Sequence, residues 1–399
     1  MTTYLLRRLV QMIAVVIISA AASYALLNFA PGGPMAGLTS IQQSDRFRLT
    51  AEDIARIRAS FELDLDLPVR FSRWLVGQPR GAIIVGNYEL FGGVIVGCRQ
   101  PVETTVEVEP GKYETARTGC ADYVRLRDLT ERRTSRGVLF GDFGPSWKIL
   151  RDRPVSDLIL SRLPKTLQLM GLSTLLALAL SIPLGVYSAV KQYSRFDYVF
   201  TTFAFLGAAM PTFFFGILFI IVFSTLPKVA GLPHLPPGSS EAVREYAIPG
   251  IGEIEPGTAL DRLLHLILPV AVLTIVNVAG FSRFVRGSML EVLRQVYVRT
   301  ARAKGLVERV VITRHTLRNA LIPFITIVVF AIPNLFGGAI ITESIFSWPG
   351  MGRLFILALG ESDYPVAMAL LFITAVLTVV ATLAADLAYT VVDPRIRLS

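Results

Sequence analysis

The sequence has few of the residues on which most soluble enzymes depend. Its 399 residues include 2 cysteines and 3 histidines, and His234, His265 and His315 lack the spacing of metal ligands. It also lacks a GxxxxGK(S/T) phosphate loop and a GxSxG nucleophile turn. These absences argue against a nucleotide site, a metal site or a catalytic serine. We expect no resident cofactor and no catalytic activity in this chain.

Charge is also scarce for a soluble protein. Charged residues make up 17% of the sequence, against about 25% in ordinary globular proteins. Hydrophobic residues make up 53%, and the mean hydropathy is +0.56. The formal net charge of +9 alone would suit a nucleic-acid partner. The apolar content instead indicates a membrane protein, and we expect no binding of nucleic acid.

Long apolar runs are what the sequence has in abundance. A helix rises about 1.5 Å per residue, so about 20 apolar residues cross the hydrocarbon core of a bilayer. Runs of that length lie at Leu9–Ala30, Gln168–Val190, Val199–Leu226, Leu266–Phe284, Ala320–Thr342 and Pro365–Tyr389. They predict an all-α integral membrane protein with six transmembrane helices. Prolines within the runs are compatible with this, because neighbouring helices can satisfy the freed backbone groups.

The short connections between these spans carry much of the positive charge. Their basic residues are Arg7 and Arg8 before the first span, Lys191 and Arg195 between the second and third, Arg283, Arg286, Arg294, Arg299, Arg302, Lys304, Arg309, Arg314 and Arg318 between the fourth and fifth, and Arg395 and Arg397 after the last. Cytoplasmic loops of membrane proteins are enriched in lysine and arginine. The pattern predicts a multi-pass protein with both termini in the cytoplasm.

The first span has a second interpretation, since a secretory signal also combines arginines, an apolar run and small residues. Its apolar run is longer than the roughly 7–15 residues of a signal core. Removal of the segment would also leave an odd number of spans. We therefore expect residues 1–30 to remain as an N-terminal transmembrane helix.

Residues 31–165 are expected to form an extracytoplasmic loop, before a five-helix core at residues 166–399. In the loop, Thr50 and Asp53 have the spacing of a capping box, and Ile54 and Ile57 follow at helical spacing. They predict a short amphipathic helix. It would lie on the outer membrane surface or pack on the loop's own core.

Residues 77–137 are expected to form a small β-rich insert in this loop. Valines alternate with polar residues from Val102 to Glu109, and Pro110-Gly111 follows as a turn. Cys98 and Cys120 flank the hairpin. In an oxidising compartment a disulfide between them would contribute about 3 kcal/mol, and we favour it over two buried thiols. The insert could bind an external partner or only stabilise the outer face.

The basic link between the fourth and fifth spans, residues 284–320, contains the stretch "VRTARAKGLVERVVITRHTLRNALIP" from Val298 to Pro323. Leu290–Lys304 is rich in helix formers, Gly305 is placed to end that helix, and Val307–Asn319 predicts a second helix. A cluster that only sets topology or attracts anionic lipid would explain the charge. It would not explain the pattern of alanine and glycine.

The stretch "YVRTARAKGL…RHTLRNALIP" resembles the cytoplasmic signature of permeases of binding-protein-dependent ABC importers, in particular the first permease subunit of the dipeptide/oligopeptide family. Gly305 matches the signature glycine, and Ala301 matches its second alanine. Arg299 and Thr300 stand where the wider signature has glutamate and alanine, a departure usual for the peptide branch. The resemblance implies an ATPase-coupling helix formed by Arg299, Thr300, Ala301, Arg302, Ala303, Lys304, Gly305 and Leu306.

Other segments carry the same resemblance in the expected order. They are "ELDLDLPVRFSRWL" and "GDFGPSWK" in the first external loop, "ESIFSWPGMGRL" after the fifth span and "DLAYTVVDPRIRL" at the C-terminus. The family often has Pro-Gly-Asp-Pro after the first span, where this chain has "PGGP" with Gly33 in place of the aspartate. The insert at residues 77–137 is longer than the family usually carries.

The resemblance implies the fold of a type I ABC importer permease in a bacterial cytoplasmic membrane. Its expected function is to form the pathway for di- or oligopeptides delivered by an extracytoplasmic solute-binding protein. The expected partners are a second, related permease, two cytoplasmic ATPase subunits that bind ATP, and membrane lipid. Glutathione, nickel or a sugar are alternative solutes. A secondary transporter is less favoured, because inverted repeats and intramembrane carboxylates are not evident.

Polar residues in or beside the spans are candidates for the pathway. Asn277 and Asn334 could contact the solute or make interhelical hydrogen bonds. Glu343 and Asp386 lie near predicted helix ends, where exposure at the interface lowers the cost of their charge. Trp348, Pro349 and Gly350 are expected on the external side, as an outer gate, a surface for the binding protein or an interfacial anchor.

Overall fold

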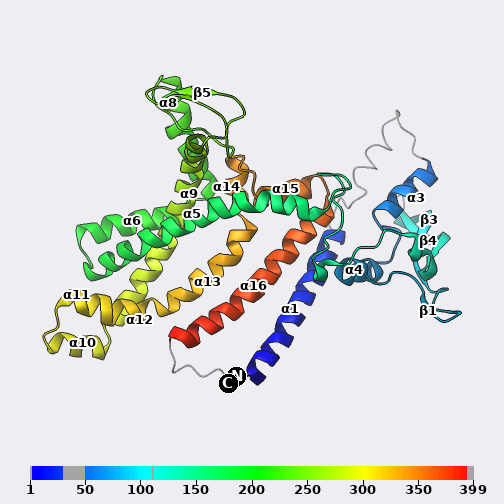
Figure 1. Ribbon diagram of the computed structural model, residues 1–399, viewed down its shortest axis with the longest axis horizontal. Helices are drawn as coiled ribbons and strands as arrows, with labels where there is room; N and C mark the ends of the chain where they lie inside the picture. Colours follow the sequence, from blue (N-terminus) through cyan, green and yellow to red (C-terminus); the bar gives the residue numbers. More distant parts are fainter. Residues whose placement is uncertain (1, 30–49, 110–111, 393–399) are drawn as a thin grey trace. The chain divides into compact units, whose positions relative to one another are not determined.

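A computed structural model describes residues 2–29, 50–109 and 112–392. The described helices are α1 (Thr2–Phe29), α3 (Ala51–Ser60), α4 (Leu67–Val76), α5 (Val155–Val190), α6 (Arg195–Ala209), α7 (Thr212–Ile220), α8 (Leu226–Val229), α9 (Ala259–Leu293), α10 (Val296–Ala303), α11 (Glu308–Val310), α12 (Arg318–Ala320), α13 (Ile322–Gly337), α14 (Ile340–Ile345), α15 (Met351–Gly360) and α16 (Tyr364–Val392) (Figure 1). Gly33, the Pro110-Gly111 turn and the C-terminal Arg395 and Arg397 lie outside these residues.

The remaining elements are short, apart from one long pair of strands. The strands are β1 (Ile83–Val85), β2 (Tyr88–Leu90), β3 (Ile95–Glu109), β4 (Lys112–Arg125), β5 (Tyr246–Ile248) and β6 (Gly252–Ile254). The 3₁₀ turns are η1 (Leu126–Glu131) and η2 (Val138–Phe140), and the π-helical turns are η3 (Ile221–Thr225) and η4 (Val311–Leu317). The predicted class, a helical membrane protein with a small β-rich part, is confirmed.

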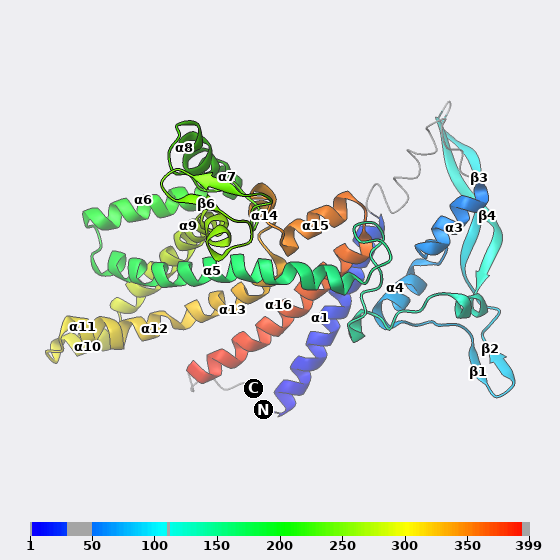
Figure 2. The same cartoon turned by 45° about the horizontal axis from the view of Figure 1, so that its top comes forward.

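The chain forms two compact units. The first comprises Met1–Val16, Ile159–Leu357 and Phe372–Ser399, and the second comprises Ile17–Leu158 and Ala358–Leu371. In the first unit, α6 and α7 both pack on α9. Figure 2 shows β3 and β4 as a long two-stranded ribbon, and both strands belong to the second unit.

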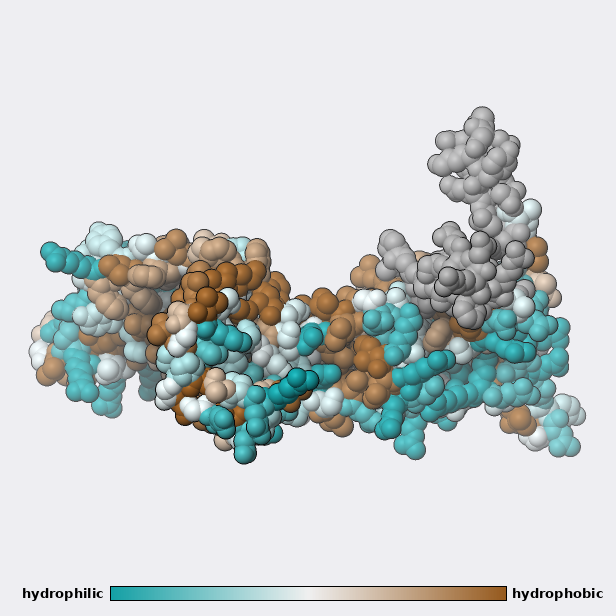
Figure 3. Space-filling model, turned by 90° about the horizontal axis from the view of Figure 1, so that it is seen from above, coloured by the Kyte–Doolittle hydropathy of each residue, from teal (hydrophilic) through white to brown (hydrophobic). Residues whose placement is uncertain are grey.

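Five described helices are long and apolar enough to cross a membrane: Leu6–Phe29, Val155–Val190, Thr212–Val229, Ala259–Leu293 and Tyr364–Leu387. A sixth span is obtained if the bent pair Glu308–Ala320 and Ile322–Pro333, which meet at 52°, counts as one. Hydrophobic residues remain on the surface of these helices, among them Ile18 and Leu175, and Figure 3 shows hydrophobic areas on one face of the molecule. Their exposure fits contact with lipid.

The span predicted at Val199–Leu226 is wrong as a single helix. The structure ends α6 at Ala209 and begins α7 at Thr212. Met210, between them, has ψ of 135°, an extended conformation. The physical reason is Pro211, because the residue before a proline is sterically driven away from the helical region.

The span predicted at Ala320–Thr342 is also interrupted. α13 ends at Gly337, and α14 begins at Ile340. Between them Gly338 has φ of +74°, a left-handed conformation that glycine adopts readily and that cannot continue a right-handed helix. The chain therefore turns before Glu343 instead of carrying that residue to the end of a continuous span.

In the second unit, α3 begins as the sequence predicts. The Thr50 hydroxyl accepts a hydrogen bond from the Asp53 N–H at 3.2 Å, and the Asp53 carboxylate accepts one from the Thr50 N–H at 3.1 Å. This is the predicted capping box. Hydrogen bonds from the Thr50 hydroxyl and N–H lower the pKa of Asp53.

The predicted β-rich insert is present. β3 and β4 pair antiparallel, and Cys98 and Cys120 are joined by a disulfide between them with Cα atoms 5.9 Å apart. This is the alternative that the sequence favours. Beneath the ribbon, a small core of Leu65, Val96, Val124 and Leu129 is buried.

A buried aspartate joins the external loop to the start of α16 within this second unit. The Asp363 carboxylate accepts a hydrogen bond from the Ser146 hydroxyl at 2.5 Å. It also accepts the N–H groups of Trp147, Lys148 and Ile149, each at 3.0 Å. The segment "GDFGPSWK" therefore has a structural role that its sequence alone does not reveal.

Candidate functional site

The basic link between α9 and α13 contains helix, glycine turn and helix, in the predicted order. The continuous helix expected at Leu290–Lys304 is divided, because α9 ends at Leu293 and α10 begins at Val296. Gln295 between them is extended, with ψ of 146°. Helix propensity is a weak preference that tertiary packing overrides. Here the break lets α10 turn back onto η4 (Figure 1).

Gly305 ends α10 as predicted. Its φ is +76°, its N–H donates to the Arg302 carbonyl at 2.9 Å, and the Leu306 N–H donates to the Ala301 carbonyl at 3.4 Å. These two bonds define a Schellman cap. A Cβ at Gly305 would meet nothing within 4 Å. Glycine is therefore needed here for backbone conformation and not for space.

α10 has one face turned into the chain. Val298 and Ala301 are buried against Val311 of η4, with Val292 and Leu293 at the edge of the cluster. Ala301, one of the expected coupling residues, is therefore buried against its own chain, unlike the others. The small side chain of Ala301 instead allows α10 to pack on η4.

The opposite face of the link is exposed and carries both charge and apolar groups. Of the predicted coupling residues, all except Ala301 are exposed: Arg299, Thr300, Arg302, Ala303, Lys304, Gly305 and Leu306. Exposed apolar side chains surround them, with Val296 at 74%, Val307 at 70% and Leu306 at 41%. Hydropathy scans for spans do not detect this apolar rim, because its residues are scattered among arginines.

Two cations of this surface are available to a partner. The Arg302 guanidinium forms an ion pair with Glu308 at 2.7 Å, so its charge is already matched. Arg299 and Lys304 form no ion pair with any residue that the structure describes. We call the exposed set of Arg299, Lys304, Leu306, Val307 and Val296 the α10 surface.

A buried ion pair stabilises the C-terminal part of α9, close to the basic link. The Arg286 guanidinium donates to both carboxylate oxygens of Asp197, at 2.9 and 3.0 Å, and the Tyr193 N–H donates to the same carboxylate at 2.9 Å. The Ser188 hydroxyl also contacts it. Arg286 is one of the arginines that indicated topology in the sequence. It also ties the turn between α5 and α6 to α9.

Trp348 lies in the core. Its side chain is 1% exposed, its indole N–H donates to the Lys165 carbonyl at 3.0 Å, and it packs among Leu169, Leu266 and Val270. A surface for a binding protein and an interfacial anchor are therefore both wrong for Trp348. The indole is too large to remain exposed where α5 and α9 offer an apolar pocket with a carbonyl acceptor.

Glu343 is buried as well, contrary to the expected exposure at a helix end. Its carboxylate is 0% exposed and accepts hydrogen bonds from the Arg353 N–H at 2.8 Å and the Thr166 hydroxyl at 3.2 Å. A Cβ at Gly350 would lie 2.4 Å from the Glu343 carboxylate, and one at Gly338 would lie 2.6 Å from it. Gly350 therefore makes space for a carboxylate, and Pro349 beside it is half-buried.

Asp386 meets a partner from the first helix. Its carboxylate lies 2.6 Å from the Arg8 guanidinium, and both side chains are about three-quarters buried, with exposures of 27% and 29%. An ion pair lowers the cost of placing each charge within a span. Arg8, expected only as a topology signal, is therefore also a structural partner of α16.

Asn277 lines a cavity of about 540 Å³ in the first unit. The residues around it come mainly from α5, α9 and α13 and are Met170, Thr174, Asn277, Phe281, Thr326, Ile327, Phe330, Ala331 and Gly338. Asn277 makes no hydrogen bond to any described residue. The Thr326 hydroxyl oxygen is likewise buried without a hydrogen-bond partner in the described part. Asn334 lies in α13, and its side chain is outside what the structure describes.

This cavity combines apolar walls with few polar groups. The interhelical hydrogen bond that Asn277 could have made is absent among the described residues.

The sequence is similar to known transport proteins. The family model described as "Binding-protein-dependent transport system inner membrane component" matches residues 181–398. Oligopeptide transport system permease protein AppB of Bacillus subtilis (strain 168) is 48% identical over 257 residues, covering 64% of this chain and 76% of that protein. Dipeptide transport system permease protein DppB of Escherichia coli (strain K12) is 40% identical over 271 residues, covering 65% and 78%.

Similarity also extends over a full chain. Probable peptide ABC transporter permease protein y4tP of Sinorhizobium fredii (strain NBRC 101917 / NGR234) is 30% identical over 400 residues, covering 100% of both chains. The residues matched by the family model include α6 through α16, and so contain the α10 surface and Asn277. On these matches, the chain belongs to the family of binding-protein-dependent transport system inner membrane components.

Proposed function

We propose that this chain is the membrane-spanning permease subunit of an ABC importer that carries di- or oligopeptides. The observation that carries the proposal is the α10 surface, where two unpaired cations and exposed apolar groups project from a segment that is packed onto α9. The relatives named above are peptide permeases, which supports a peptide over the alternative solutes.

In this proposal the α10 surface docks on a cytoplasmic ATPase subunit. Arg299 and Lys304 would meet acidic groups there, and Leu306 and Val307 would enter an apolar groove. Both termini would then lie in the cytoplasm. The complete assembly would have a second, related permease, two ATPases that bind ATP, and an extracytoplasmic solute-binding protein.

The packing inside the link gives a route for motion from α10 to the spans. Val298 and Ala301 bind α10 to η4, which leads into α13, and Val292 and Leu293 connect the same cluster to α9. A push on α10 would therefore move α9 and α13 together. These helices line the Asn277 cavity, so the motion would alter access to it, as alternating access requires.

The test uses the assembled transporter in proteoliposomes, with Arg299→Glu and Lys304→Glu combined in one variant. Repulsion from acidic groups on the ATPase should abolish solute-stimulated ATP hydrolysis and uptake. Lys191→Glu is the matched control, because Lys191 is exposed in the short turn between α5 and α6. The control should retain both activities.

Membrane insertion and copy number are measured in parallel, so that loss of protein is not mistaken for loss of coupling. Normal stimulated hydrolysis in the double variant would remove the α10 surface from the coupling role. The solute is tested separately, by mass spectrometry of molecules that co-purify with the complex. Recovery of a metal or a sugar in place of peptides would favour the alternative permease.

A further inference from the structure

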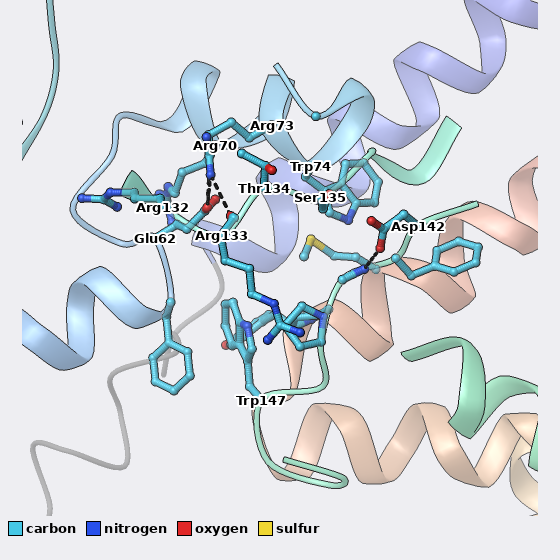
Figure 4. Close-up of a pocket in the computed structure, with 18 of the residues that line it drawn as sticks. Glu62, Arg70, Arg73, Trp74, Arg132, Arg133, Thr134, Ser135, Asp142 and Trp147 are labelled. Carbon is cyan, nitrogen blue, oxygen red and sulfur yellow. Dashed lines mark hydrogen bonds and ion pairs between the residues drawn. The ribbon is translucent and has the colours of Figure 1, made fainter. Parts of the chain in front are cut away.

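A second cavity lies in the second unit, apart from the Asn277 cavity and from the α10 surface. Its volume is about 510 Å³. Aromatic rings form much of its wall. Tyr24 and Trp74 have ring centroids 5.4 Å apart, and Trp147 and Tyr364 have centroids 6.0 Å apart. Figure 4 shows Trp74 and Trp147 among the residues that line the cavity. We call this cavity the aromatic pocket.

Four arginines line the aromatic pocket, and two of them are neutralised. The Arg73 guanidinium lies 2.7 Å from the Glu62 carboxylate. Arg132 forms a two-bond ion pair with the carboxylate of Asp64. The side-chain hydrogen bond to Asp64 raises the pKa of Arg132. These two pairs are complete without a ligand.

The other two arginines, Arg70 and Arg133, lack a carboxylate partner among the described residues. Arg70 donates from Nη1 to the neutral Asn28 side-chain oxygen at 3.0 Å, and its Nε is buried without a hydrogen-bond partner. Figure 4 shows the Arg133 side chain extending toward Trp147. The pocket's other carboxylate, Asp142, is engaged by the N–H groups of Arg136 and Gly144. The pocket therefore holds an excess of positive charge.

The base of the pocket lies at the ends of two membrane-spanning helices. Tyr24 is five residues before the end of α1 at Phe29, and Met368 is four residues after the start of α16 at Tyr364. At about 1.5 Å per residue, the base reaches about 6–8 Å into these helices. The headgroup layer adds about 5–8 Å on each side of the hydrocarbon core, so helix ends at its outer edge would place the base of the pocket at the boundary between headgroups and acyl chains.

We propose that the aromatic pocket binds the headgroup of an anionic phospholipid from the outer leaflet. Arg70 and Arg133 would hold the phosphate oxygens, which supply the acceptor that the buried Nε of Arg70 lacks. Trp74, Trp147 and Met368 would cover the glycerol and the upper acyl carbons. The bound lipid would connect α4, which carries Arg70, and the loop that carries Arg133 to the ends of α1 and α16.

The depth and the chemistry together favour a lipid over a peptide. A lipid presents an anion and an apolar chain at this level of the bilayer without leaving it. A hydrophilic peptide would have to leave water to reach Tyr24 and Met368. The inference depends on α1 and α16 crossing the membrane and on the orientation proposed above, and it is independent of which solute is carried.

The test measures thermal unfolding of the assembled transporter in detergent while short-chain phosphatidylglycerol is added. Phosphatidylcholine, inorganic phosphate and a tripeptide are added in parallel samples. Phosphatidylglycerol should raise the unfolding temperature at concentrations at least about tenfold lower than phosphatidylcholine, since loss of a charge-assisted hydrogen bond lowers affinity by about that factor. Native mass spectrometry should show phosphatidylglycerol retained on the permease.

Arg133→Gln is the main variant, because Arg133 is exposed and its replacement should leave the fold intact. It should weaken the phosphatidylglycerol response about tenfold, and Arg70→Gln should do the same or more. Arg151→Gln is the control, since Arg151 is exposed and does not line the pocket. It should respond as the unaltered protein does.

Several results would overturn the proposal. Equal responses to the two phospholipids would show that the anionic headgroup is not recognised. An equal response to inorganic phosphate would indicate a simple anion site, and a response to the tripeptide alone would indicate a solute site. An unchanged phosphatidylglycerol response in both Arg133→Gln and Arg70→Gln would exclude the pocket itself.

Discussion

Two segments of this permease look alike as motifs and differ as structures. The segment 296–307, which carries the α10 surface, and the segment "ESIFSWPGMGRL" both combine charged residues, bulky apolar residues and glycine. In the first, the charges and most apolar groups face outward, and Gly305 has open space around it. In the second, Glu343 and Trp348 are buried, and a Cβ at Gly350 would collide with the Glu343 carboxylate. The first segment is therefore exposed for binding a partner, whereas the second is buried and packs helices of the chain together.

The largest expected effect is at Trp348. Trp348→Ala would remove a buried indole and leave a cavity beside Leu169 and Leu266, which costs about 3–5 kcal/mol of unfolding free energy. Denaturant unfolding of the purified chain in detergent measures it. Trp348→Phe keeps most of the volume and should cost clearly less. Equal stability of Trp348→Ala and the unaltered chain would show that the Trp348 side chain is not packed in the core.

The second effect tests the contact between Gly350 and Glu343. Gly350→Ala would push a methyl group into the carboxylate and should destabilise the chain by about 1–3 kcal/mol, as overpacking does. In a Glu343→Ala background the methyl group has space, so the same change should cost much less. The double-mutant cycle measures this coupling. Additive effects of the two changes would contradict a steric contact.

The third effect concerns Gly305, where space is open but φ is positive. Gly305→Ala should cost about 1 kcal/mol, because alanine is strained in the left-handed region. Gly305→Asn is the control and should cost less, since asparagine tolerates this conformation. Unfolding measurements distinguish the two. If alanine and asparagine are equally tolerated, the cap contributes little to the stability of the link.

The smallest effect on stability is expected at the two unpaired cations. Arg299→Gln and Lys304→Gln should each change the unfolding free energy by no more than about 0.5 kcal/mol, because both side chains are exposed. The same variants should lower solute-stimulated ATP hydrolysis in the assembled transporter. A large loss of stability without loss of solute-stimulated ATP hydrolysis would show that Arg299 and Lys304 stabilise the fold and do not bind a partner.

Several features of the fold could be predicted from local sequence patterns. The Thr50–Asp53 capping box, the β3–β4 ribbon and the end of α10 at Gly305 each depend on residues close in sequence, whose spacing is visible directly. The spans at α1 and α16 were predictable because hydrocarbon length sets a simple count of apolar residues. The helix break before Pro211 could also have been predicted from the sequence, but a search based on hydropathy alone does not detect it.

Long-range partners were not predictable from such patterns. Thr166 and Arg353 meet at the Glu343 carboxylate, and Ser146 meets Asp363 from more than 200 positions away, with a separation of 217 residues. A glutamate or aspartate whose carboxylate is buried and hydrogen-bonded cannot be distinguished, from the sequence alone, from one whose carboxylate is exposed. The expectation of exposure for Glu343 was therefore wrong.

By itself, the sequence of this permease determined that the chain is a multi-pass membrane protein and that the basic link has a helix–glycine–helix form, because each follows from hydropathy or from backbone preferences within a few residues. Only the tertiary structure decided which face of α10 is exposed, that Ala301 packs inward, and that Trp348 and Glu343 are buried. The physical reason is that burial depends on neighbours brought together by packing, and a residue's own chemistry does not specify those neighbours.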